Sequence, residues 1–148
     1  MGLEYTLEIA SQVQPIELLQ LLFEGAQPRA DGDDWNLAQP GFMVKANPIS
    51  HPHPLALQME VASNLRMVLE LGGVVNYAVA MSNILNTVVR VLEETKSDLI
   101  FYVADVDMLL WRKEELFLNE ASSFWSPSFL IQVHLPYKLQ AIKPLVEA

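Results

Sequence analysis

The chain has 148 residues and no cysteine, which excludes disulfides, zinc thiolates and cysteine nucleophiles. Apolar residues make up 51% of the sequence and charged residues 18%, so we expect one folded domain over residues 1–148 rather than a disordered chain. The net charge of −9 disfavours binding to nucleic acid and to anionic membranes, and it favours a basic partner.

The N-terminal residues contain no basic region ahead of an apolar one, so a signal peptide is not expected. Residues 3–9 alternate apolar and polar side chains, which predicts an antiparallel strand with a polar outer face. Pro15 suits the first position of a short helix, because apolar residues follow it at helical spacing. Residues 26–39 are polar and rich in turn residues, which predicts a loop, and Gly41–Ala46 reads as a second strand.

Three acidic residues of the predicted loop, Asp31, Asp33 and Asp34, resemble the start of a calcium loop. Calcium is not expected, because Phe42 stands where such a loop needs a bidentate glutamate. Trp35 beside these acids either packs into the core or contacts a partner, and the core interpretation is favoured.

The chain has three histidines, His51, His53 and His134, of which the first two are one residue apart. A metal site would require folding to bring His134 to the other two. The prolines on either side of His53 favour a rigid extended turn instead. We therefore predict no metal and no cofactor.

Residues 55–71 carry apolar side chains at nearly every odd position. This pattern fits a hairpin with a three-residue loop at Ala62–Asn64, or one long bent strand. Leu55–Ala62 could also form a short helix, since it is rich in helix formers. Leu65–Leu71 is the firmer strand prediction.

Apolar residues recur at helical spacing from Tyr77 to Leu92, which predicts a long helix that covers the sheet. Residues 97–120 then contain three apolar runs with polar gaps, typical of an antiparallel meander. The first run, Leu99–Ala104, begins without alternation, so we expect a strand covered on both faces. Asp105 and Asp107 fall in the first gap, where a tight turn is expected.

Ser126-Pro127 is a strong start for a short helix over 127–132, and residues 141–146 suggest a last one. The order of elements predicts an α+β single domain with an antiparallel sheet of about five to six strands. The long helix and the shorter N-terminal helix are expected to pack on one face of it. No apolar run reaches the roughly 20 residues of a membrane span, so we expect a soluble cytoplasmic protein.

Catalytic motifs are absent from the sequence: it has no phosphate-binding glycine loop, no serine elbow, no HExxH and no CxxC. We therefore expect a non-enzymatic binding protein. One alternative is a small enzyme or a ligand- or metal-binding domain with a pocket between sheet and helix, using His51, His53 or His134. A homo-oligomeric scaffold that associates through an open sheet edge is another.

Several short segments along the chain resemble one family of small bacterial proteins. They are, in order, Met1–Ala10, a strand ending near Leu71, the long helix, Leu116–Glu120, Trp125-Ser126-Pro127 and Leu135-Pro136-Tyr137. Together they resemble the immunity proteins of the myxobacterial swarming-inhibition (Sit) toxin systems, in the family of the third Sit immunity protein. The sequence departs from the family pattern at residues 62–65, where an FG-type segment and an arginine are usual, and at residues 71–73.

The resemblance implies a cytoplasmic protein that binds and neutralises a cognate toxin without a cofactor. An acidic protein can associate rapidly with a basic toxin through electrostatic steering. We therefore place the predicted contact on Asp31, Asp33, Asp34 and Trp35. Asp105 and Asp107 form a second predicted contact.

Overall fold

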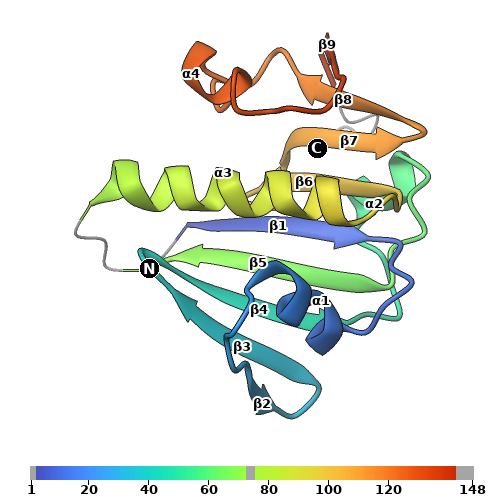
Figure 1. Cartoon of the computed structure of the whole chain (residues 1–148). Coiled ribbons are helices and arrows are strands. Elements are labelled where there is room, and N and C mark those ends of the chain that lie inside the picture. Colours follow the sequence, from blue (N-terminus) through green and yellow to red (C-terminus); the bar gives the residue numbers. More distant parts are fainter. Residues whose placement is uncertain (1–2, 73–75, 143–148) are drawn as a thin grey trace.

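The computed structural model describes residues 3–72 and 76–142, and a single sheet runs through them (Figure 1). Its strands follow the order β2-β3-β4-β5-β1-β6-β7-β8-β9. Each neighbouring pair is antiparallel except β8 and β9, which pair in parallel. The predicted α+β class is confirmed. The predicted size was wrong, since nine strands lie in the described residues, and the pairing is not wholly antiparallel. Residues 143–146 of the predicted last helix lie outside the described residues.

β1 (Glu4–Ile9) is the central strand, between β5 (Leu65–Leu71) and β6 (Leu99–Val103). Its antiparallel pairing is confirmed, but the predicted polar outer face was wrong. Thr6 is only 4% exposed and Glu8 is fully buried. The alternation of apolar and polar residues shows which side chains share a face of a strand. It does not show whether other elements cover the polar face.

The predicted loop over residues 26–39 was wrong, because this segment contains β2 (Arg29–Asp31) and β3 (Asp34–Gln39), which form a hairpin. Asp31 pairs with Asp34 across a two-residue turn, in which Gly32 has φ +63°. Glycine at the first turn position suits the tight turns that join antiparallel strands. β4 (Phe42–Pro48) confirms the second predicted strand and extends beyond its predicted end.

Residues 55–62 begin with a short helix, α2 (Pro54–Gln58), so the hairpin interpretation of this segment was wrong. Its first turn is capped by His53, whose Nδ1 accepts a hydrogen bond from the Leu55 N–H at 3.1 Å. The strand at Leu65–Leu71 is confirmed. The good helix formers of this segment therefore outweighed its period-two pattern.

The predicted meander is confirmed as β6, β7 (Asp107–Lys113) and β8 (Glu115–Asn119). Residues 99–102 of β6 are all buried, as expected for a strand covered on both faces. β9 (Lys138–Gln140) adds an exposed three-residue edge strand beside β8.

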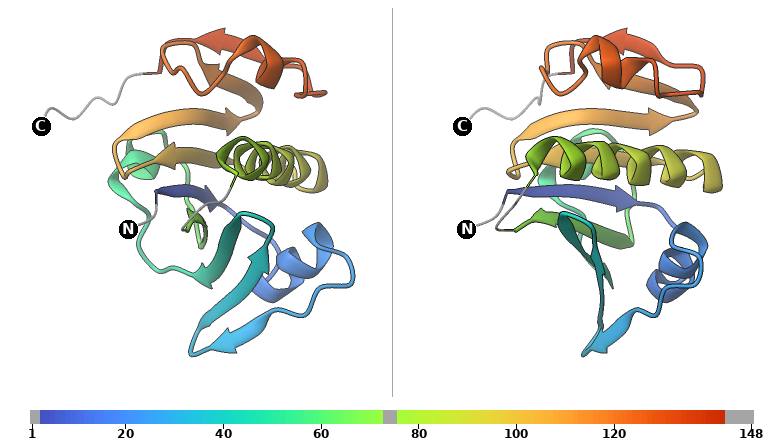
Figure 2. Two further views of the ribbon diagram at one scale, coloured as in Figure 1. Left: turned by 90° about the vertical axis from the view of Figure 1, so that its left-hand side faces the viewer. Right: turned by 60° about the vertical axis from the view of Figure 1, so that its left-hand side comes forward.

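Helices lie on both faces of the sheet (Figure 2). α1 (Pro15–Leu22) and α3 (Tyr77–Glu94) contribute to the larger buried cluster, together with the odd-numbered residues of β1 and β5. Leu55 and Ala56 of α2 belong to a second cluster with Ile100 and Tyr102. β1 and β6 are thus enclosed from both sides, which accounts for the burial of their polar residues.

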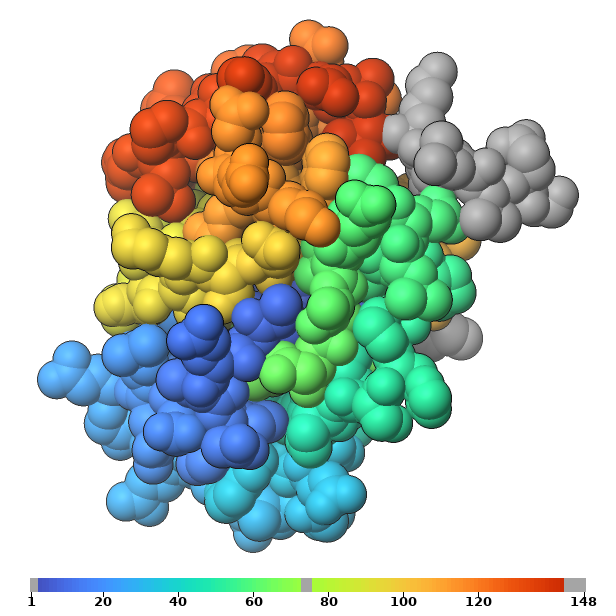
Figure 3. All heavy atoms as spheres, turned by 90° about the vertical axis from the view of Figure 1, so that its right-hand side faces the viewer, coloured from blue at the N-terminus to red at the C-terminus, as the bar shows by residue number. Residues whose placement is uncertain are grey.

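The carboxyl end of α3 is fastened to the meander by Arg112 of β7. The Arg112 guanidinium donates hydrogen bonds to the carbonyl oxygens of Leu92 and Ser97, each at 2.9 Å, and of Thr95 at 3.1 Å. A cation is well placed there, since the last carbonyls of a helix lack partners within it. In Figure 3 this end of α3 (yellow) lies between the N-terminal segment (blue) and the meander (orange).

α4 (Pro127–Leu130) begins where it was predicted and is shorter than expected. The Ser126 side chain caps it by accepting a hydrogen bond from the Phe129 N–H. None of the helices in the described part of the chain combines the length and apolar character that a bilayer crossing requires.

Candidate functional site

A cleft of about 810 Å³ opens between the amino end of α3 and the segment that joins β8 to α4. The left view of Figure 2 faces the end of the molecule on which α3 begins. We call this cavity the aromatic cleft, and its lining includes Tyr5, Tyr77, Met81, Asp107, Phe124 and Phe129. A volume of this size is within the range of sites that bind small molecules or groups of side chains.

The floor of the aromatic cleft is a set of interlocked rings centred on Phe124. The Phe124 ring centroid lies 5.8 Å from that of Tyr5, 5.3 Å from Phe129 and 4.8 Å from Trp125. The contacts with Phe129 and Trp125 are edge-to-face, a favourable geometry for aromatic pairs. Trp125 also donates its indole N–H to the Leu109 carbonyl oxygen at 2.6 Å, which fixes the segment to β7.

Asn119 holds the wall of the aromatic cleft in place. Its side-chain amide donates to the carbonyl oxygens of Met108 at 2.6 Å and of Ile142 at 3.3 Å. Its side-chain oxygen accepts hydrogen bonds from the N–H groups of Ala121 at 3.0 Å and Ile142 at 2.9 Å. The buried amide therefore satisfies its hydrogen-bonding groups while it joins β7, the end of β8 and the residues after β9.

Two large side chains in the lining of the aromatic cleft are exposed, Tyr77 at 57% and Val106 at 61%. Asp107 supplies a carboxylate, and no Lys, Arg or His is among the described lining residues. Burial and then the Tyr77 hydroxyl raise the pKa of Tyr5, so its phenol stays neutral at physiological pH. Exposed apolar groups around an apolar cavity are typical of binding sites.

The first predicted contact lies elsewhere, at the turn between β2 and β3. Asp31 and Asp33 are exposed and Asp34 is half-buried, and we call Asp31–Asp34 the acidic hairpin tip. Trp35 points to the opposite face of the sheet and packs against the larger buried cluster, which agrees with its interpretation as a core residue. The pleat of β3 thus separates the tryptophan from the neighbouring acids.

The two predicted contacts are not brought together in the fold. The acidic hairpin tip lies toward the Ile9 end of β1, whereas Asp105 and Asp107 lie beside its Tyr5 end (Figure 1). Strands β4, β5 and β1 separate β3 from β6. Of the six predicted residues, Asp107 is the one that lines the aromatic cleft.

Asp105 occupies the predicted tight turn, which is confirmed by its φ of +62°. Its carboxylate lies 3.9 Å from Nε2 of His53. His51 and His134 are exposed. Over residues 3–72 and 76–142, no group of three or more His, Asp or Glu is arranged to hold a metal ion, so the histidines do not form one site.

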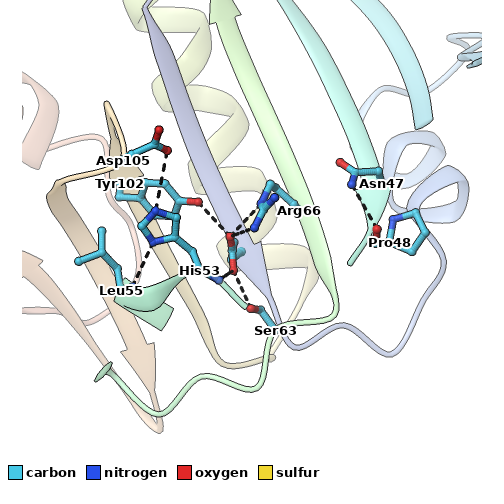
Figure 4. Close-up of polar contacts among 9 residues, drawn as sticks. Asn47, Pro48, His53, Leu55, Ser63, Arg66, Tyr102 and Asp105 are labelled. Carbon is cyan, nitrogen blue, oxygen red and sulfur yellow. Dashed lines mark hydrogen bonds and ion pairs between the residues drawn. The ribbon is translucent and has the colours of Figure 1, made fainter. Parts of the chain in front are cut away.

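Glu8 is fully buried and is the centre of a polar network with His53, Ser63, Arg66 and Tyr102, the four residues that Figure 4 labels around it. One carboxylate oxygen accepts hydrogen bonds from the His53 N–H at 3.0 Å and the Ser63 hydroxyl at 2.8 Å. The other accepts from the Tyr102 hydroxyl at 2.9 Å and the Arg66 guanidinium, whose Nη2 lies at 2.7 Å.

Burial alone would raise the pKa of the Glu8 carboxyl, but these hydrogen bonds outweigh it and hold its pKa below the ordinary value. Burial, and then the negative charge of Glu8, raise the pKa of Tyr102. Both oxygens of Glu8 are occupied by donors from β5, β6 and the segment around α2. Glu8 therefore acts as an anchor between these elements rather than as a general base.

The residues of the aromatic cleft were missed by sequence reasoning. Tyr77 was assigned to the buried stripe of the long helix, but it is largely exposed. Phe124 and Phe129 belong to no periodic pattern, so the sequence did not indicate that the Phe124 ring contacts both Phe129 and Tyr5, which lies near the other end of the chain. The one feature of the sequence that could have indicated the cleft was Tyr77, an aromatic residue at the first position of the long helix.

The fold and the cleft together define the class of the protein: an α+β protein with one mixed sheet and a surface cleft lined by aromatic rings. The model of the SitI3-like family matches residues 3–129, so the chain belongs to the SitI3-like family. This match confirms the resemblance seen in the sequence. No curated protein and no solved structure matches the chain.

Proposed function

We propose that the chain is a cytoplasmic immunity protein that binds a toxin delivered by sibling cells and neutralises it without catalysis. The observation that carries this proposal is the family match over residues 3–129. The net charge of −9 supports a basic partner, because opposite charges accelerate the encounter of two proteins. The full use of Glu8 as a structural anchor is consistent with a non-enzymatic role.

In this proposal the acidic hairpin tip makes the first contact with the toxin, and Asp105 and Asp107 make a second one. The hairpin tip is exposed at one edge of the sheet, where an approaching protein can reach it. Trp35 supports the hairpin from its core side. Like charges at Asp31 and Asp34 are paired across the turn, an unfavourable arrangement that a cationic partner would relieve.

The proposal is tested by competition between strains of the native host. A strain that lacks the protein is mixed with its toxin-producing parent, and survival is counted with and without the wild-type chain supplied on a plasmid. We expect the deletion strain to be killed and the plasmid to restore survival. A parent that cannot deliver toxins is the control. Equal survival of the deletion strain in every mixture would contradict the immunity role.

A second candidate function is a small-ligand-binding domain, and the observation that favours it is the aromatic cleft. A metabolite that occupies the cleft in the folded state alone would raise the melting temperature. None of the three histidines is among the described lining residues, so this candidate no longer depends on them. The homo-oligomer alternative would use the exposed edge strands β2 and β9, and size-exclusion chromatography tests it.

A further inference from the structure

We propose that the aromatic cleft binds a segment of the toxin in which a lysine or arginine stands beside a large apolar side chain. This inference rests on the proposed function and names the site and the chemistry of the contact. It differs from the sequence-based placement, because the acidic hairpin tip takes no part in the cleft.

The large apolar side chain of the proposed toxin segment matches the apolar floor of the cleft. Met81, Phe124 and Phe129 line a cavity of about 810 Å³, which is larger than a single side chain fills. Anchor residues that dominate protein–protein affinity are large side chains that enter such desolvated pockets. The exposed Tyr77 and Val106 extend this apolar surface outward.

The lysine or arginine of the proposed toxin segment matches the negative charges in and beside the cleft. Asp107 lines the cavity, Asp105 is two residues away with a side chain 77% exposed, and the described lining contains no basic side chain. The rings of Tyr5, Tyr77 and Phe124 line the same cavity, and a cation that lies over the face of an aromatic ring is attracted to it.

The amino end of α3 is a source of positive potential nearby, but it is capped within the chain. The side-chain oxygen of Asn76 accepts a hydrogen bond from the Val79 N–H at 3.1 Å, and its carbonyl oxygen accepts one from Ala80. The first of these bonds satisfies one of the unpaired N–H donors at this end of the helix, which would otherwise attract an anion. Asp107 carries the one full charge among the described lining residues, and a full negative charge outweighs the roughly half positive charge of a helix end.

The cleft is preorganised for such a segment. Asn119 joins the strands behind the wall, and Trp125 is bonded to the Leu109 carbonyl oxygen. Because these contacts hold the wall before a partner arrives, little ordering is needed on binding.

The test uses the whole chain and a short probe, N-acetyl-arginyl-phenylalanine amide, titrated while amide signals are followed by NMR. The matched probe is N-acetyl-glutamyl-phenylalanine amide. We expect saturable shifts at Tyr77, Met108 and Phe124 with a dissociation constant on the order of millimolar for the arginyl probe. We also expect clearly weaker binding of the glutamyl probe.

Two variants and two controls locate the effect. Ala78 is exposed and lines the cleft, so a Trp at this position fills the cavity without displacing the core. Ala78→Trp should therefore lower the affinity for the arginyl probe about ten-fold or more. Asp107→Asn should lower the affinity for the arginyl probe about two- to five-fold, which corresponds to the free energy of an exposed ion pair. Gln20→Trp and Glu93→Gln make comparable changes at exposed helix positions remote from the cleft, and should leave binding unchanged.

Equal binding of the two probes, or an Ala78→Trp variant that binds as well as the wild type, would overturn the inference. The survival experiment separates this failure from that of the proposed function. If the wild-type chain protects the host and Ala78→Trp and Asp107→Asn protect equally well, the cleft is not the toxin site, although the immunity role stands. Loss of protection in these two variants, with protection kept in the two controls, supports the inference.

Discussion

At the scale of single residues, Glu8 shows how a buried charge can tie a fold together. Its carboxylate is fully buried, and it faces Arg66, whose side chain is 31% exposed. We expect Glu8→Gln to lower the free energy of unfolding by about 2–4 kcal/mol, because it leaves a partly buried guanidinium without its counter-charge. Urea unfolding at pH 7 measures this loss. Glu4→Gln, an exposed change on the same face of β1, is the control and should cost under about 0.5 kcal/mol.

The stability difference between the wild type and Glu8→Gln should also depend on pH. Because the pKa of Glu8 is held below its ordinary value of 4.5, its stabilisation is complete above that value and is lost as the pH falls below it. The difference in unfolding free energy between the wild type and Glu8→Gln should therefore shrink between pH 5 and about pH 3. A difference that stays constant over this range would show that the stabilisation comes from shape rather than from charge.

The role of Glu8 could not be predicted from the sequence, although its position in a strand could. The alternation of residues 3–9 correctly identified β1 and the face that carries Tyr5, Leu7 and Ile9. The burial of the other face depends on α2 and on Tyr102, residues far away in the chain. Local patterns carry no information on such long-range partners.

At the scale of elements, the contact between α3 and the turn before β4 leaves no room for a side chain. Gly41 has φ +87°, and a Cβ there would lie 2.6 Å from the Cβ of Ala80 on α3. We expect Gly41→Ala to lower the free energy of unfolding by about 2–4 kcal/mol, because backbone strain and displacement of the helix add together. Thermal and urea unfolding measure the change.

Gly25→Ala is the matched control for this effect. Gly25 has a similar φ of +82°, but nothing lies within 4 Å of the position of its Cβ. This variant should therefore show the backbone cost alone, about 1 kcal/mol. Equal losses in the two glycine variants would mean that α3 moves away from the turn at no cost.

The elements were predicted best where the pattern was long. The periodicity from Tyr77 to Leu92 and the three runs of residues 97–120 gave α3 and the meander. The hairpin of β2 and β3 was missed because turn-forming and polar residues surround the few apolar ones, and the three residues of β2 are all exposed, so backbone pairing defines that strand. The pairing of β9 with β8 was missed because three exposed residues are too few to establish an alternating pattern.

At the scale of the whole molecule, nine net negative charges create a field that acts on a partner before contact. The acidic residues of the two candidate sites lie toward opposite ends of the sheet, and other exposed acidic residues lie outside both sites. The effect of a carboxylate's location can therefore be tested separately from its contribution to the net charge. The aromatic cleft could not have been located from the sequence, because residues from β1, α3 and the segment before α4 meet only in the folded chain.

The contribution of the acidic hairpin tip can be measured with two triple variants of equal net charge. One replaces Asp31, Asp33 and Asp34 with Asn, and the other replaces the exposed Glu24, Glu93 and Glu94 with Gln. Association with the toxin that the chain neutralises is followed by stopped-flow at low and at physiological salt. If the hairpin tip contacts the toxin, its triple variant should associate about three- to ten-fold more slowly than the second variant at low salt.

Slower association of the hairpin variant would have two explanations, the loss of long-range steering and the loss of a direct contact. The salt dependence distinguishes them. Long-range steering is screened beyond a Debye length of about 8 Å at physiological ionic strength, so a pure field effect should vanish there for both variants alike. A direct contact should also raise the dissociation rate of the hairpin variant, since the lost ion pairs are formed in the complex. Identical association and dissociation rates for the two variants would remove the hairpin tip from the interface and leave the aromatic cleft as the candidate contact.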